Sequence, residues 1–216
     1  MNANDVALYL QGNPDFFDDH AELLAQLTVP HPADGRAISL TERQLHALRE
    51  KIRQLESKFA ELLRFGEEND QISEKVHRLA LALIEAEDFE TIRQAILLNL
   101  LEDFSVPHVA MRVWNSVLSR EGPEFAPVSE AVRLFAGDLR SPYCGPPSQP
   151  EVTGWFGEAS GRVRSMALMP LRRGVQVFGL LALGSEEPER FYPEMGTLYL
   201  GRIGDMVSLA LLRQLG

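Results

Sequence analysis

Apolar residues recur at alternating spacings of three and four between positions 45 and 62. They are Leu45, Leu48, Ile52, Leu55, Phe59 and Leu62. On an α-helix this spacing aligns them in one stripe, called here the helix seam. A helix buries such a stripe only against another helix. The seam therefore predicts a long helix that pairs with a second copy of the chain to form a homodimer.

The predicted long helix begins near Leu40 and continues toward Leu83. The segment 39–42 has the form of a capping box, in which Ser and Glu side chains bond unpaired backbone N–H groups. A softer patch at 66–70 interrupts the apolar spacing and marks a possible kink. Two interpretations stay open: one continuous, self-associating helix, or two helices folded back as a hairpin at this patch.

Short helices are predicted ahead of the long one. The first spans 5–10 and ends at Gly12. Asn13 followed by Pro14 indicates a second helix, with Asn as its N-cap and Pro at its first position. Further apolar residues extend this helical pattern until Pro30 stops it: Leu23, Leu24 and Leu27. The apolar faces of such small helices need a cover.

Beyond residue 87 the hydrophobic period changes. Asp88 is a plausible N-cap for a helix over 89–104, whose apolar residues follow the helical period. Apolar and other residues then alternate over 109–114, which predicts a strand. The following segment, 115–164, is irregular and rich in Pro and Gly. Short helices are expected within it at 129–135 and 152–157.

Two apolar runs, 165–171 and 175–184, predict a β-hairpin, and a last helix is expected over 193–215. This order of elements predicts an α+β fold: an antiparallel sheet flanked by helices, preceded by short helices and the long, dimerising helix. The expected domains are short helices at 1–38, the connecting helix at 39–86 and a sheet domain at 87–216.

Three small residues share one face of the predicted last helix: Gly201, Gly204 and Ser208. Their spacing of three and four lets a neighbouring element approach that face closely. The neighbour is either the sheet or a second copy of the chain, and the spacing does not distinguish between them.

The composition excludes several classes of function. The 216 residues carry a formal net charge of −10, which disfavours binding to nucleic acid. No stretch reaches the length of a membrane span, so no membrane partner is expected. One cysteine, Cys144, permits no intrachain disulfide, and this is typical of a reducing compartment. We therefore expect a cytoplasmic protein.

No motif in the chain indicates catalysis. The five histidines lack the spacing of metal ligands, and there is no phosphate-binding glycine loop. We expect no metal site and no enzymatic activity, and the sequence indicates no particular cofactor.

A small-molecule pocket is the candidate site, because aromatic walls with a few polar groups suit such a ligand. The candidate residues lie in the irregular segment and the predicted strands: Arg112, Trp114, Tyr143, Cys144, Trp155, Phe156, Met166 and Leu168. The alternative is that these side chains pack the core beneath a long loop. Likewise, Cys144 is expected in a loop, either as a redox-sensitive thiol or as a small apolar filler.

The second half of the chain resembles a GAF domain. The resemblance rests on Arg164-Ser-Met-Ala-Leu-Met-Pro-Leu171, Gly179-Leu-Leu-Ala-Leu-Gly184 and Phe191-Tyr-Pro-Glu194, in that order. It implies a GAF-like fold that either binds a small molecule between its sheet and the irregular connections or serves as a dimerising module. The Asn-Lys…Phe…Asp-Glu signature of cyclic-nucleotide-binding members is absent, so a cyclic nucleotide is not the expected ligand.

The first half resembles the bacterial domain of unknown function 484 family, and this similarity covers nearly the whole chain. The matching segments are Tyr9-Leu10, Asn13-Pro-Asp-Phe-Phe17, Glu22-Leu-Leu24, Pro30-His31 and Ser39-Leu-Thr-Glu-Arg-Gln-Leu45. The resemblance implies a GAF-like domain behind a helical region and no established activity. We expect a non-catalytic, dimeric sensory or regulatory protein with a small-molecule or protein partner. The alternative is a constitutive adaptor between proteins that has no small-molecule ligand.

Overall fold

The computed structural model describes residues 2–26, 28–30, 37–114 and 121–215, with no side-chain description for residues 24–42. The chain divides into two compact units, Met1–Glu67 and Glu68–Gly216. The division falls inside one long helix, and the domain boundaries expected at 38/39 and 86/87 stay predictions.

The first unit opens with three short helices, as the sequence predicts. They are α1 (Ala3–Gly12), α2 (Phe16–Asp19) and α3 (Ala21–Gln26). A pair of antiparallel strands follows, β1 (Thr28–Pro30) and β2 (Ala37–Ser39), which the sequence did not indicate. The expected position of Leu27 and the side chains of the expected capping box at 39–42 lie outside the described residues.

Asn13 ends one helix and does not begin the next. Its side-chain amide donates a hydrogen bond of 2.8 Å to the carbonyl of Tyr9, in the last turn of α1. Because α1 ends there with unpaired carbonyl groups, the amide satisfies one of them. The second helix begins only at Phe16, after Asp15. The prediction of Asn13 as an N-cap was therefore wrong.

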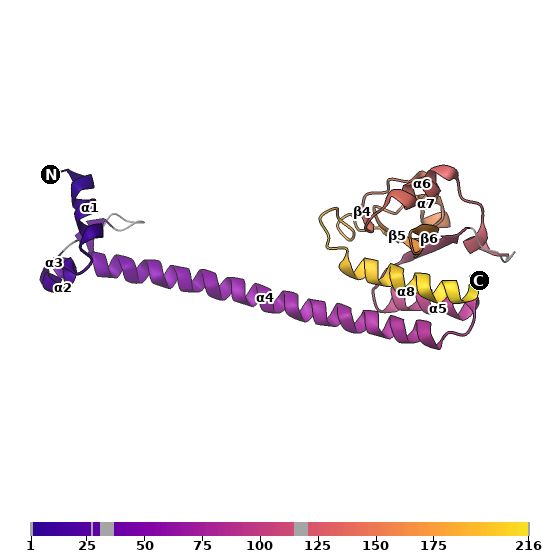
Figure 1. Cartoon of the computed structure of the whole chain (residues 1–216), viewed down its shortest axis with the longest axis horizontal. Coiled ribbons are helices and arrows are strands. Elements are labelled where there is room, and N and C mark those ends of the chain that lie inside the picture. Colours follow the sequence, from indigo (N-terminus) through magenta and orange to yellow (C-terminus); the bar gives the residue numbers. More distant parts are fainter. Residues whose placement is uncertain (1, 27, 31–36, 115–120, 216) are drawn as a thin grey trace. The chain divides into compact units, whose positions relative to one another are not determined.

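Helix α4 runs from Leu40 to Glu85 as a single 46-residue helix (Figure 1). It begins at the predicted residue and passes through Gly66 and Asn69 without leaving the helical conformation. A glycine in a helix costs about 1 kcal/mol, which the many good helix formers on either side offset. The two-helix hairpin folded back at 66–70 was therefore the wrong alternative.

The second unit is built on a four-stranded antiparallel sheet. Its strands are β3 (His108–Val113), β4 (Tyr143–Gly145), β5 (Ser165–Arg173) and β6 (Gln176–Ser185), in the order β3-β6-β5-β4. The central strands β5 and β6 form the predicted hairpin. Its turn lies at Gly174 and Val175, and Gly174 has a φ of 60°, a left-handed conformation that favours glycine.

Helices cover both faces of this sheet (Figure 1). One face carries α5 (Phe89–Glu102), α8 (Leu198–Leu215) and the C-terminal part of α4. The other carries α6 (Glu130–Asp138) and α7 (Pro150–Gly154). Two short 3₁₀ helices, η1 (Pro123–Phe125) and η2 (Gly157–Ala159), lie in the connections. These elements confirm the predicted α+β class and the GAF-like arrangement.

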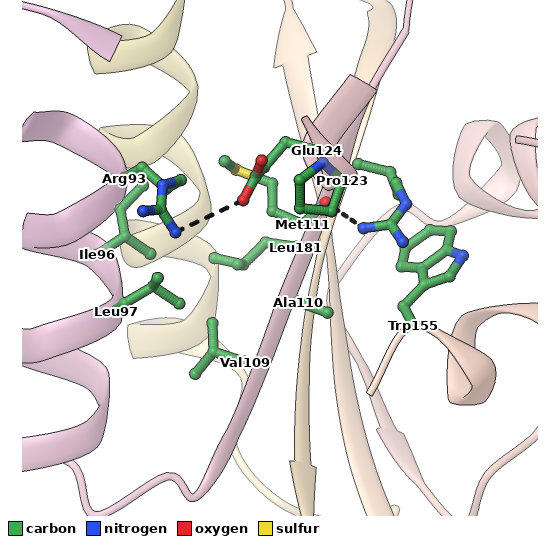
Figure 2. A pocket seen from close by; sticks show the side chains of 11 residues that line it. Arg93, Ile96, Leu97, Val109, Ala110, Met111, Pro123, Glu124, Trp155 and Leu181 are labelled. Carbon is green, nitrogen blue, oxygen red and sulfur yellow. Dashed lines mark hydrogen bonds and ion pairs between the residues drawn. The ribbon is translucent and has the colours of Figure 1, made fainter. Parts of the chain in front are cut away.

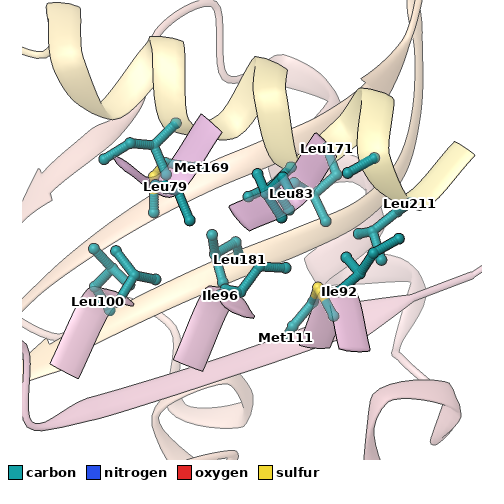
Figure 3. Packing of buried hydrophobic residues seen from close by; sticks show 14 of the residues in the cluster. Leu79, Leu83, Ile92, Ile96, Leu100, Met111, Met169, Leu171, Leu181 and Leu211 are labelled. Carbon is teal, nitrogen blue, oxygen red and sulfur yellow. The ribbon is translucent and has the colours of Figure 1, made fainter. Parts of the chain in front are cut away.

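The larger core lies between the sheet and the first group of helices (Figure 3). Fully or nearly fully buried side chains come from all of these elements: Leu79, Leu83, Ile92, Ile96, Leu100, Met111, Met169, Leu171, Leu181 and Leu211. The start of α5 is capped as predicted, since Asp88 Oδ1 accepts a 2.8 Å hydrogen bond from the N–H of Thr91.

Helix α8 begins later than expected and faces the sheet with Gly204 and Ser208, whereas an added Cβ at Gly201 would meet nothing within 4 Å. A turn at 192–195, closed by the N–H of Met195 and the carbonyl of Tyr192, delays the helix until Leu198. Gly204 lies against Met169 of β5, where an added Cβ would come within 3.4 Å of the Met169 Cβ. Ser208 accepts a 3.0 Å hydrogen bond from the N–H of Arg172. This face of α8 therefore packs on the sheet.

The packing of the larger core predicts that two adjacent leucines of α5 contribute differently to the free energy of unfolding. Leu100 is completely buried, whereas Leu101 is 51% exposed. Leu100→Ala is expected to lower the free energy of unfolding by about 2–5 kcal/mol, because it leaves a cavity. Leu101→Ala is the matched control and is expected to change it by about 0.5 kcal/mol or less. Chemical denaturation measures both, and equal losses would contradict this core.

Candidate functional site

Seven of the eight candidate pocket residues lie toward the sheet face covered by α6 and α7. Trp114, Met166 and Leu168 are buried in the cluster of that face. The partly buried rings at its margin are those of Tyr143, Trp155 and Phe156. The seventh, Arg112, lies over the Trp155 ring, with its guanidinium carbon 5.0 Å from the ring centroid.

Much of this face is packed core. Met166 and Leu168 are completely buried against side chains of α6 and α7, among them Val132 and Val152. The indole N–H of Trp114 donates a 3.1 Å hydrogen bond to the carbonyl of Val177. These side chains are held in place by packing and hydrogen bonding. Packing and hydrogen bonding therefore account for the positions of these side chains on this face.

Phe156 is fixed by the edge of the same sheet. Its ring lies beside His108 of β3, with 6.2 Å between the ring centroids. It also lies against Gly184 of β6, where an added Cβ would come within 3.0 Å of the ring. Glycine at 184 therefore leaves the room that this ring occupies.

Cys144 lies in strand β4 and not in the expected loop. It pairs with Ala167 of β5 and is buried in the cluster of the opposite, helix-covered face. Because side chains alternate along a strand, Tyr143 and Cys144 point to different faces. Burial raises the pKa of the Cys144 thiol to about 11. The structure thus separates Cys144 from the other candidates and keeps it protonated at neutral pH.

A cleft of about 160 Å³ lies at the outer edge of strand β3 (Figure 2). It is lined by side chains of α5, β3, β6, η1 and the segment after α7: Arg93, Ile96, Leu97, Val109, Ala110, Met111, Arg112, Pro123, Glu124, Trp155 and Leu181. Two of the predicted pocket residues, Arg112 and Trp155, belong to it. This edge cleft combines an aliphatic lining with three charged side chains.

Arg93 of α5 is already held by carboxylates. It donates hydrogen bonds of 2.6 and 2.9 Å to both oxygens of Glu90, one turn earlier in the helix. These bonds lower the pKa of Glu90 to about 2. A third carboxylate oxygen, Oε1 of Glu124, lies 3.8 Å from Arg93 Nη1 (Figure 2). The charge of Arg93 is therefore largely balanced within the protein.

Arg112 is held differently. Its Nη1 donates a 3.0 Å hydrogen bond to the carbonyl of Met111, and its guanidinium stacks on Trp155. It forms no ion pair in the described part of the chain. Partial burial lowers the pKa of Arg112, while Glu124 and Glu151 nearby raise it. Arginine nevertheless remains charged in proteins. Arg112 is therefore a cation that no described carboxylate contacts directly.

Arg93 and Glu124 were missed by sequence reasoning. The Glu90/Arg93 spacing of three residues is typical of an exposed helical ion pair and carried no sign of a cleft. Glu124 belongs to a three-residue 3₁₀ helix in the irregular segment. Only the fold brings η1 beside α5.

The helix seam forms a second candidate site, in the first unit. Its six apolar side chains are each between 47% and 67% exposed in the single chain. The predicted stripe thus lies on the surface of α4.

The described residues offer few other kinds of site. They contain no group of three His, Cys, Asp or Glu side chains placed to hold a metal ion. Among them, no helix combines the length and apolarity that crossing a membrane requires.

Cys144 is expected to react slowly in the folded protein. A pKa of about 11 leaves roughly one thiol in ten thousand ionised at pH 7, and the side chain is buried. Labelling with iodoacetamide, followed by mass spectrometry, should be slow in buffer and complete in guanidinium chloride. Cys144→Ser is the control for specificity, since the chain has no other cysteine. Rapid labelling of the native protein would contradict the buried placement.

Comparisons with solved structures find matches over about two thirds of this chain, and they include GAF domains. The GAF domain of a phosphoenolpyruvate-protein phosphotransferase from Coxiella burnetii superposes with a TM-score of 0.52 at 10% identity, covering 67% of this chain and 94% of that one. The A. aeolicus nlh2 GAF domain gives 0.48 at 15% identity, covering 68% and 99%. Free methionine-R-sulfoxide reductase from Neisseria meningitidis gives 0.47 at 17%, covering 65% and 88%.

At these identities the structural likeness shows the fold alone. A comparison with curated protein sequences finds no match. The family described as "Protein of unknown function, DUF484" matches residues 1–214. The chain therefore belongs to the DUF484 family.

Proposed function

We propose that this protein is a non-catalytic, dimeric regulatory protein whose GAF-like domain receives a small molecule or a protein partner. The observation that carries the proposal is the exposed helix seam. A soluble protein rarely leaves a regular apolar stripe in water, and a stripe with this spacing fits a copy of itself.

The size of the seam supports self-association. Full burial of a Leu, Ile or Phe side chain contributes roughly 1.5–3 kcal/mol. A dimer would bury the seams of two chains, six residues from each. Each side chain is already one third to one half covered in the single chain, so pairing would contribute about half of that value per residue, roughly 10–20 kcal/mol for both seams. This is of the same order as the loss of translational and rotational freedom on association, about 4–15 kcal/mol, so pairing of the seams requires that most of the exposed area be buried.

A further apolar groove in the second unit supports a helical bundle at the dimer axis. It lies between the last turns of α4 and the middle of α8 and has a volume of about 280 Å³. Ile84 and Leu209 border it, and each is 68% exposed. A second copy of α4 and α8 would cover this groove.

Helix α8 links this groove to the sheet. Gly204 and Ser208 hold α8 against β5, while Met206 and Leu209 line the groove. In the proposed mechanism, occupancy of the GAF-like domain shifts the sheet slightly. The shift biases the bundle between two arrangements, and a bound partner reads the difference.

The packing beneath α6 and α7 favours a second candidate, a constitutive adaptor without a small-molecule ligand. Met166 and Leu168 are completely buried in the packed cluster of that face. The short N-terminal helices also expose apolar side chains that a protein partner could cover: Val6, Leu8, Tyr9 and Leu23. Native mass spectrometry distinguishes the two functions, because a stoichiometric co-purified metabolite would exclude the adaptor.

A charge in the seam is expected to dissociate the dimer. In Leu55→Glu, each chain would bring a carboxylate into the paired helices, at a position where the wild type buries a leucine. We expect a dimer for the wild type at micromolar concentration and a monomer for this variant. Light scattering coupled to size-exclusion chromatography measures the mass.

Ala60→Glu is the matched control, because Ala60 lies on α4 outside the seam spacing. It adds the same charge and is expected to remain dimeric. A monomeric wild type at micromolar concentration would reject the proposed dimer, as would a Leu55→Glu variant that stays dimeric.

A further inference from the structure

The outer edge of strand β3 is open where the edge cleft lies. Trp114 donates its backbone N–H to the carbonyl of Phe178, so Trp114, Arg112 and Ala110 face β6. Val109 and Met111 therefore direct their N–H and C=O groups outward. Neither N–H has a hydrogen-bond partner within the described ranges. The cleft thus contains unpaired backbone donors as well as charged side chains.

The guanidinium of Arg112 lies beside this edge of β3. Its hydrogen bond to the outward carbonyl of Met111 holds the guanidinium beside the strand, and the Trp155 ring supports one side of it. A guanidinium has five N–H donors, and the structure assigns one of them to a protein acceptor. No buried side-chain nitrogen lacks a partner among the described residues, so the unused donors are accessible.

The charges of the cleft limit the ligand to a monoanion. Arg93 is paired with Glu90 and Glu124, so Arg112 is the cation of this lining that has no carboxylate in contact among the described residues. A ligand with two or more negative charges would be repelled by Glu124 and by the net charge of −10. A single carboxylate fits the planar donors of Arg112.

The volume of the cleft limits the ligand further. Drug-sized and nucleotide-sized ligands occupy pockets of about 300–1,000 Å³. The cleft measures about 160 Å³, close to the roughly 150 Å³ of an apolar cavity that accepts benzene. Apart from its charged side chains, the lining is largely aliphatic or aromatic. This volume fits an apolar group of about the size of one ring.

We propose that the edge cleft binds a small organic monocarboxylate. Its carboxylate would lie on Arg112 and the outward N–H of Met111, and its apolar group would lie against the aliphatic side chains on the α5 side of the cleft, among them Ile96 and Leu97. This assignment rests on the proposed regulatory function, because it names the class of small molecule that the GAF-like domain receives.

Benzoate and benzamide test the proposal on the full chain. The two probes have the same shape, and only benzoate carries the charge. Isothermal titration calorimetry is expected to give benzoate a dissociation constant of about 1 mM or tighter. Benzamide should bind at least tenfold more weakly, because it cannot form the charge-assisted bonds to Arg112.

Substitutions at Arg112 locate the binding site. Arg112→Gln is expected to weaken benzoate binding at least tenfold and to leave benzamide binding unchanged. Arg112→Lys keeps the charge without the planar donors, so its affinity should lie between those of the wild type and Arg112→Gln. Arg133→Gln, on α6 outside the cleft, is the matched control and should bind benzoate like the wild type. Circular dichroism checks that each variant is folded.

Two results would overturn the proposal: no saturable binding of benzoate up to about 10 mM, or equal benzoate affinities for the wild type and Arg112→Gln. If Arg112→Gln does not fold, the benzoate and benzamide affinities of the wild type decide, and equal affinities overturn it. The mass of the protein is measured in the same samples. A dimer that ignores benzoate removes the ligand proposal alone, and a monomer that binds benzoate removes the dimer alone.

Discussion

The second unit depends on one constraint: its two central strands are apolar on both faces. Most residues of β5 and β6 are buried, including the consecutive run from Ser165 to Met169. Such a sheet is stable in water only when helices cover both of its sides. The end of α4 and the helices α5 and α8 cover one face, and α6 and α7 cover the other. Among the described residues, no further strand pairs with the outer edge of β3 beside the cleft.

Much of the fold could be predicted from the sequence, because the apolar pattern of each element reflects the face or faces that it buries. Periodicity is a local property, so α4, α5 and the β5–β6 hairpin could be identified from their own residues. Strand β4 could not, because three residues are too few to show a period. Its conformation depends on pairing with β5, which is distant in sequence. Asn13 was misassigned because the same side chain can close the end of one helix or the start of another.

The candidate site could be predicted only in part, because its residues come from elements that are separated in sequence. Arg112 and Trp155 could be proposed because a cation and an aromatic ring in or near a sheet suit a small ligand. Their partners in the edge cleft could not be identified from the sequence. Arg93 lies one turn after Glu90 and resembles an ordinary surface ion pair, and Glu124 comes from an irregular segment. Only the tertiary structure places the two beside Arg112.

The C-terminal residues of the chain bond the end of α4, and this bears on the order in which the chain is synthesised and folds. Arg213 donates a 2.6 Å hydrogen bond to the carbonyl of Leu83, which precedes it by 130 residues. Gln214 likewise bonds the carbonyl of Glu87, just beyond the helix. At about 5–20 residues per second, a ribosome adds Arg213 roughly 7–26 s after Leu83. During that interval the apolar faces of α4 and α5 lack the helix that covers them, and apolar surface exposed in this way makes a partly folded chain prone to aggregate.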